Sequence, residues 1–132
     1  MGYTHYWNTK KSSPEAFEKF SKTVAELINL VDVSICGPYG DGDAVLSKIE
    51  VAFNGDSSLG EDFESFSITF GIDASDFCKT GNRPYDKVVV AALIVAKEYG
   101  IVSSWSSDGG EEFGDFDEAF DLLAKIGWNF GE

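Results

Sequence analysis

The sequence predicts one α+β domain over residues 1–132, an antiparallel sheet with helices packed on one face. A chain of 132 residues suits a single hydrophobic core. Hydrophobic residues make up 43% of the chain and aromatic residues 14%, which favours a packed core over disorder. Short alternating segments, mostly joined by turn-rich loops, are interspersed with segments of helical period, in the order β-α-β-β-β-α-β-α.

A strand and an amphipathic helix are predicted first. Residues 3–7 alternate as a strand does. Ser13 is a predicted N-cap, and Pro14 suits the first position of a helix. The helix then carries apolar side chains at steps of three and four, which predicts one face packed on the sheet. These side chains are Phe17, Phe20, Val24, Leu27, Ile28 and Val31.

The middle of the chain predicts three strands. A short strand over 33–36 is followed by alternating segments at 48–53 and 66–70. Asn54 and Gly55 form a typical turn pair, so we expect the chain to leave the sheet there. The segments at 48–53 and 66–70 are predicted to pair antiparallel across the polar loop between them.

A loop and a buried helix come next. Residues 76–86 are mostly polar and contain Pro84, which predicts a loop. Residues 87–99 are apolar on nearly every side, so this helix is expected to be the most buried one. Gly100 suits the position just after its C-terminus.

The last part of the chain predicts a strand over 101–105 and a final helix. Asp115, with Glu118 three residues later, resembles a capping box in which Asp replaces Ser or Thr. This pattern predicts a helix that begins near Asp115 and ends near Gly127.

The charge of the chain narrows the classes of partner. The chain has 23 acidic and 10 basic residues, a formal net charge of −13. Such a charge repels nucleic acid and anionic membranes. No apolar run reaches the roughly 18 residues of a membrane span, and the opening residues lack the features of a secretory signal. We therefore expect a cytoplasmic protein that contacts neither nucleic acid nor membrane directly.

Groups suited to catalysis or metal binding are sparse. His5 is the single histidine and lies in an aromatic strand, where a histidine is usually structural. Cys36 and Cys78 are predicted to be free thiols, because the chain has no export signal. Acid pairs such as Asp41 and Asp43 lack further calcium ligands. The sequence predicts no catalytic residue, metal or cofactor, and a small enzyme of unknown class is the least favoured hypothesis.

One cationic segment stands out in the acidic chain. Lys79 and Arg83 lie just before the helix predicted at 87–99, where backbone N–H groups and cations together can hold an anion. Two interpretations stay open: the cations pair with internal carboxylates, or they line a pocket for a nucleotide or another small anion. The predicted pocket consists of His5, Tyr6, Trp7, Lys79, Arg83 and Tyr85.

The acidic residues are concentrated near the end of the chain. Before residue 34 four acidic residues are balanced by four lysines, whereas from Ile101 onward eight acidic residues face Lys125 alone. A continuous acidic surface can imitate the phosphates of DNA and occupy a basic groove, although it can equally be a plain solvated face. The predicted partner-binding residues are Asp108, Glu111, Glu112, Asp115, Asp117, Glu118 and Asp121, extended by Glu61, Asp62 and Glu64.

Four segments carry a resemblance to a family. They are the opening MGYTHYW at 1–7, the strand end at 53–55, FCKTGNRPYD at 77–86 and the residues 106–109. In these segments the chain is similar to a family of small, uncharacterised proteins of phages, prophages and bacteria. The resemblance implies an accessory protein that acts on host machinery. The first hypothesis is therefore an anti-CRISPR-type inhibitor and DNA mimic in the host cytoplasm, and the second is a nucleotide-binding signal sponge.

Overall fold

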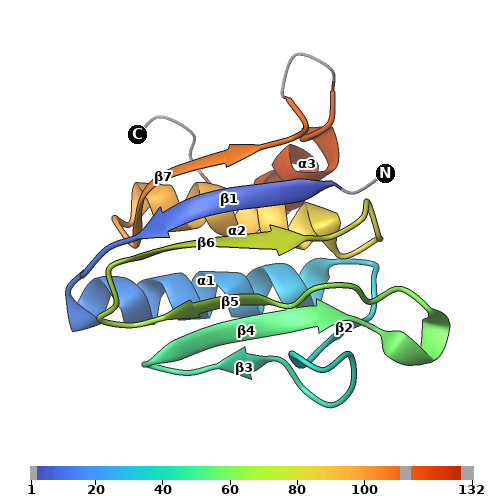
Figure 1. Ribbon diagram of the computed structural model, residues 1–132, viewed down its shortest axis with the longest axis horizontal. Helices are drawn as coiled ribbons and strands as arrows, with labels where there is room; N and C mark the ends of the chain where they lie inside the picture. The colour runs from blue at the N-terminus through green and yellow to red at the C-terminus, as the bar shows by residue number, and fades with distance from the viewer. Residues whose placement is uncertain (1–2, 111–113, 129–132) are drawn as a thin grey trace.

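The computed structural model describes residues 3–110 and 114–128, and it is an α+β structure in two layers. Strands form one layer, and the helices lie behind it (Figure 1). The helices are α1 (Pro14–Leu30), α2 (Asp86–Glu98) and α3 (Asp117–Lys125), with a short 3-10 turn η1 (Ser57–Leu59). The strands are β1 (Thr4–Thr9), β2 (Ile35–Cys36), β3 (Val45–Leu46), β4 (Glu50–Gly55), β5 (Phe66–Thr69), β6 (Ala74–Lys79) and β7 (Val102–Ser107).

The strand layer consists of two antiparallel sheets that lie side by side. One has the order β6-β1-β7, and the other has the order β2-β4-β3 with β5 also paired to β4. The predicted pairing of the strands at 48–53 and 66–70 is confirmed, since Phe53 lies opposite Phe66. β5 and β6 are neighbours in Figure 1, but β5 pairs with β4 and β6 pairs with β1. The hairpin between them is therefore opened, and the two sheets separate there.

Helix α1 begins and packs as its sequence predicts. Ser13 Oγ accepts a hydrogen bond from the Ala16 N–H at 3.0 Å, and Pro14 is the first helical residue. This cap satisfies one of the N–H groups that a helix start leaves free. The apolar side chains predicted to face the core do so: Phe17, Phe20, Val24 and Leu27 are fully buried.

Helix α2 is the centre of the helix layer. Its residues from Val88 to Leu93 are fully buried, which confirms the prediction of a helix surrounded by other elements. Gly100 follows it with φ +74°, a left-handed conformation that glycine adopts readily. The buried rings of Trp7 on β1 and Phe66 on β5 pack against each other in the core, with their centroids 5.0 Å apart. Each fully buried aromatic or aliphatic side chain of this kind stabilises the fold by about 1.5–3 kcal/mol.

The strand β6 occupies part of the segment for which a loop is predicted. Its side chains are exposed from Ala74 to Phe77, and Cys78 is the first that is fully buried. Such a segment has little hydrophobic alternation, so its sequence resembles a loop. Its backbone nevertheless pairs with β1 over six residue pairs, from Thr4 opposite Lys79 to Thr9 opposite Ala74. The pairing of backbone groups decides its structure.

Two further predictions of local structure are wrong. Asn54 and Gly55 do not turn the chain but continue β4, opposite Cys36 and Ile35 of β2. The Asn54 side chain instead holds the following loop, because its amide contacts backbone groups of Phe63. The conformation of Asn54 and Gly55 is therefore determined by pairing with β2, and no local sequence pattern indicates that pairing.

The second wrong prediction is the capping box before the last helix. Helix α3 begins at Asp117 with Phe116 at the N-cap, and no side chain caps it. The Asp115 carboxylate accepts a hydrogen bond from the Gly110 N–H at 3.0 Å instead. Asp115 thus closes the loop before the helix rather than its first turn.

Two further findings bear on the sequence predictions. Cys36 is half-buried, Cys78 is buried, and both are free thiols as predicted. Within residues 3–110 and 114–128, none of the helices combines the length and the apolar character that crossing a membrane requires.

Candidate functional site

A buried polar bridge joins three elements at the start of β1. Asp86, in the first turn of α2, accepts a hydrogen bond from Thr80 at the end of β6, with 2.5 Å between the oxygens. The same carboxylate oxygen lies 2.6 Å from His5 Nε2 on β1. Because His5 and Thr80 are fully buried, this carboxylate is shielded from water and its two hydrogen bonds replace its hydration.

A second bridge lies next to the first. The Tyr85 hydroxyl and the Cys78 thiol both donate to the backbone carbonyl of Glu64, and the Lys79 N–H donates to its side chain at 2.7 Å. Burial, followed by the negative charge of Glu64, raises the pKa of Cys78 to about 12. Burial raises the pKa of Tyr85 as well. The thiol and the phenol therefore stay protonated near neutral pH, and they act as hydrogen-bond donors rather than nucleophiles.

The pocket predicted around the cationic segment is not formed by its six residues. His5 and Trp7 point to the helix side of β1 and are buried, whereas Tyr6 between them is exposed on the other side. Tyr85 is also fully buried, in the core. Alternation along a strand sends neighbouring side chains to opposite faces, so the side chains of His5 and Trp7 point away from that of Tyr6.

The two cations of this segment share an aromatic partner. Lys79 Nζ lies 5.9 Å from the centroid of the Phe63 ring, and Arg83 Cζ lies 5.2 Å from it. Neither cation forms an ion pair with a carboxylate among the residues that the structure describes. A Cβ atom on Gly81 would lie 2.4 Å from the same ring, so this glycine lets the ring pack against the turn.

Three exposed carboxylates gather where β7 ends and α3 begins, and we name Asp108, Asp115 and Asp117 the acidic corner. Asp108 accepts a hydrogen bond from the Thr4 N–H at 3.1 Å, which fixes it beside the start of β1. Burial, then the negative charges of Asp115 and Asp86, raise the pKa of Tyr3 to about 12. Asp115 therefore lies close to the first strand as well.

The remaining acids of the predicted surface have different surroundings. Glu118 pairs with Lys87 at 3.1 Å, and Lys87 also pairs with Asp32 at 3.0 Å. These side chains line a hollow of about 140 Å³ together with Asp121 and Lys125. Negative charge is partly balanced there. Glu111 and Glu112 lie outside the described residues.

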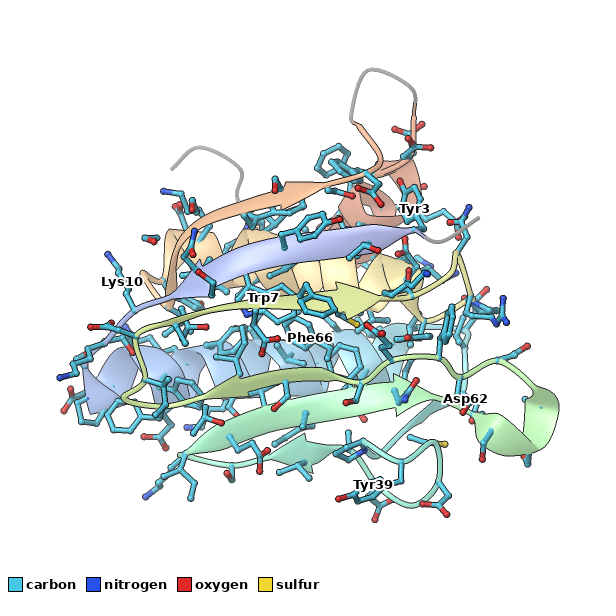
Figure 2. All side chains as sticks on the ribbon, in the orientation of Figure 1. Tyr3, Trp7, Lys10, Tyr39, Asp62 and Phe66 are labelled. Atoms are coloured by element: carbon cyan, nitrogen blue, oxygen red, sulfur yellow. The ribbon has the colours of Figure 1, made fainter. Side chains whose placement is uncertain are left out.

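The acids near η1 lie apart from the acidic corner. The Glu64 N–H donates to the Lys79 carbonyl, the Thr80 N–H donates to the Tyr3 carbonyl, and the Asp108 N–H donates to the Thr4 carbonyl. The ends of β6 and β1 therefore separate Glu64 from Asp108. Figure 2 shows the same order, with Asp62 and Tyr3 on either side of the end of β6. Glu61 and Asp62, both half-buried, lie on the Glu64 side of this boundary.

One surface, the outer face of the sheet β6-β1-β7, is not predicted from the sequence. A hollow of about 580 Å³ lies there, and it is lined by residues of all three strands. Its aromatic residues are Tyr6, Trp7, Phe77 and Trp105. Tyr6 and Phe77 lie opposite each other on β1 and β6 and are exposed, whereas Trp7 is buried. Alternation within 74–79 places Phe77 outward and Cys78 inward, but this signal is readable only once the segment is known to be a strand.

Comparison of the chain with protein-family models, with curated proteins and with solved structures found no match.

Proposed function

We propose that this protein is an accessory inhibitor of the phage type, which occupies the basic groove of a host nucleic-acid-handling protein such as a CRISPR effector. The observation that carries the proposal is the acidic corner. Asp108 directly follows β7, Asp115 lies in the loop before α3, and Asp117 is the first residue of α3. All three are exposed and form no ion pair within the described part of the chain. Unpaired carboxylates remain available to a partner.

Electrostatics favours this class of partner. The chain has a net charge of −13, so it attracts cationic surfaces and repels nucleic acid. Complementary charge raises the association rate and excludes wrong partners more than it raises affinity. The buried groups agree with a binding role, because Cys78 is held protonated and the His5 Nε2 atom already faces Asp86.

The test is a competition experiment with purified nucleic-acid-handling effectors, in which the protein displaces labelled DNA or guide RNA. Displacement is expected to weaken by about tenfold or more between about 0.05 and 0.3 M salt, because salt screens exposed charges. A variant that neutralises four of the acidic residues after β7 is expected to abolish displacement. Its substitutions are Glu111→Gln, Glu112→Gln, Asp115→Asn and Asp117→Asn.

A matched control removes the same charge elsewhere. Glu15→Gln, Glu26→Gln, Asp41→Asn and Asp43→Asn change four exposed carboxylates outside the acidic corner. This variant is expected to displace nucleic acid within about threefold of the original protein, since distant exposed charges are screened. Displacement that ignores salt, or that both variants lose equally, contradicts the proposal.

A second candidate function is the binding of a small anion at Lys79 and Arg83. The observation in its favour is that both cations lie over the Phe63 ring and have no carboxylate partner among the described residues. A thermal-shift screen with phosphate and nucleotides tests it. A ligand at about 100 times its Kd adds about 2.7 kcal/mol of stability, and Lys79→Ala should remove the shift.

A further inference from the structure

The outer face of the sheet β6-β1-β7 carries two side-chain rows with different chemistry. In the first row Tyr6 lies between Phe77 on β6 and Ser106 on β7. The exposed fractions of the two aromatic residues are 44% for Tyr6 and 56% for Phe77, which is high for rings of this size. Figure 1 shows the helices on the other side of the strands, so these rings face away from the helix layer.

The second row is polar and satisfied within the sheet. Ser75 donates to Asn8 Oδ1 at 2.6 Å, and Asn8 Nδ2 donates to Ser104 Oγ at 3.0 Å. These bonds join β6, β1 and β7 and hold the face in a fixed shape. This polar row therefore helps to fix the positions of the Tyr6 and Phe77 rings beside it. Most of its own hydrogen-bonding groups are already paired within the sheet.

The charge on this face has a single sign. Among the described residues, no lysine or arginine lines the hollow. Tyr6 connects the hollow to the acidic corner, since its hydroxyl lies 3.4 Å from Asp108 Oδ1. An exposed aromatic face beside a carboxylate suits a planar cation that stacks on the rings and pairs with the acid.

We propose that this face is an arginine-docking platform, in which guanidinium groups of a protein partner stack on Tyr6 and Phe77 while Asp108 balances their charge. The inference rests on the proposed function, for it names the part of the basic partner that the sheet recognises. Guanidinium is planar and weakly hydrated, whereas the lysine ammonium is compact and strongly hydrated. The platform therefore distinguishes arginine from lysine, which the acidic corner alone does not.

The experiment compares octa-arginine and octa-lysine peptides as probes by calorimetry at physiological salt. The original protein is expected to bind octa-arginine about three- to tenfold more tightly than octa-lysine, as stacking on exposed rings implies. Tyr6→Ala with Phe77→Ala is expected to abolish that preference and to leave octa-lysine binding within about twofold. Tyr39→Ala removes an aromatic ring that is 89% exposed on the loop between β2 and β3, and it is expected to keep the preference.

The outcomes separate the two proposals. If the double variant keeps the preference for arginine, or if the original protein shows none, the platform is wrong while the acidic corner stands. If neutralising the acidic corner changes the affinity for neither peptide, the proposed function fails. Binding of a single-stranded RNA through Tyr6 and Phe77 would also overturn the platform, because aromatic rings on a sheet can stack bases. If the double variant does not fold, Phe77→Ala alone repeats the test. It is expected to halve the preference for octa-arginine over octa-lysine.

Discussion

His5 Nε2 lies 2.6 Å from Asp86 Oδ1 inside the core, where the first strand meets the second helix. The two residues are 81 positions apart in the chain. Thr80 donates to the same oxygen, so one carboxylate ties β1, the end of β6 and α2 together. A buried carboxylate with few alternatives for hydrogen bonding holds these elements in one arrangement.

Removing this carboxylate should destabilise the protein strongly. Asp86→Ala is expected to lower the free energy of unfolding by about 2–4 kcal/mol, because it leaves the His5 and Thr80 side chains buried without their partner. Thr80→Val keeps the shape and removes the hydrogen bond to Asp86, together with two longer contacts of the hydroxyl, to the Tyr3 carbonyl and the Asn82 N–H, so about 1 kcal/mol is expected. Guanidinium unfolding measures both. The exposed Asp41→Asn serves as control, within about 0.5 kcal/mol of the original. If Asp86→Ala lowers the free energy of unfolding by less than Thr80→Val does, the bridge is contradicted.

The Cys78 thiol should make the protein sensitive to alkaline pH. In the unfolded chain this thiol ionises near its ordinary pKa of 9.0, whereas in the fold its pKa is about 12. Above pH 9 the unfolded state releases a proton that the folded state keeps, so stability falls as pH rises. The slope from this thiol is about 1.4 kcal/mol per pH unit between about pH 9 and 12. Cys78→Ala should flatten this part of the stability curve, and an unchanged slope would count against the assignment.

The same burial predicts a difference in thiol reactivity. Cys36 is half-buried, whereas Cys78 is enclosed and donates to the Glu64 carbonyl. A thiol reagent at about pH 8 is expected to modify Cys36 at least about 100-fold faster than Cys78, because the thiolate reacts and access is needed. Mass spectrometry of the partly labelled protein measures both rates. Equal rates in the folded protein would contradict the buried position.

Gly109 should tolerate no larger residue while Tyr3 is in place. A Cβ atom at Gly109 would lie 1.4 Å from the Tyr3 hydroxyl oxygen, so Gly109→Ala must displace the ring. Overpacking of this kind is expected to cost about 1–3 kcal/mol. Tyr3→Leu removes the obstructing atoms, and in its presence Gly109→Ala should cost about 0.5 kcal/mol or less. A double-mutant cycle in urea measures the coupling, and strictly additive costs would show that the two residues do not meet.

Asn54 should be necessary for the loop after β4. Its side-chain N–H groups donate to the carbonyls of Pro38 and Phe63, at 3.3 and 2.9 Å. Asn54→Asp keeps the shape but places a carboxylate oxygen against these carbonyls, so a loss of about 2–3 kcal/mol is expected. Limited proteolysis should then cut within residues 56–65 sooner than in the original protein. Asn29→Asp, an exposed position on α1, provides the matched control.

Much of the fold could be predicted because the sequence of a helix shows which of its faces are buried and where it begins. The apolar period of α1 and its Ser13 cap predict both the start of that helix and its buried face. The continuous apolar stretch of α2 predicts its central position in the same way. The strands β4 and β5 alternate clearly, so their existence and pairing were also predictable.

The candidate site could be predicted only in part. The exposure of Asp108, Asp115 and Asp117 follows from their charge, so the acidic corner was within reach of the sequence. The shared face of Tyr6 and Phe77 was not, because the two residues are distant in the chain and meet through a strand that the sequence does not mark. The contact between His5 and Asp86 could not be predicted either, because the two residues are also distant in the chain.

The sequence by itself determined the class of the fold, its helices, and the acidic character of the surface. Those properties depend on composition and on periods of a few residues, which neighbouring side chains along the chain encode. The tertiary structure alone decided that residues 74–79 pair with β1, that Asn54 and Gly55 stay in a strand, and that the two sheets separate between β5 and β6. Backbone hydrogen bonds between distant segments decide these features, and every residue except proline offers the same backbone groups for them.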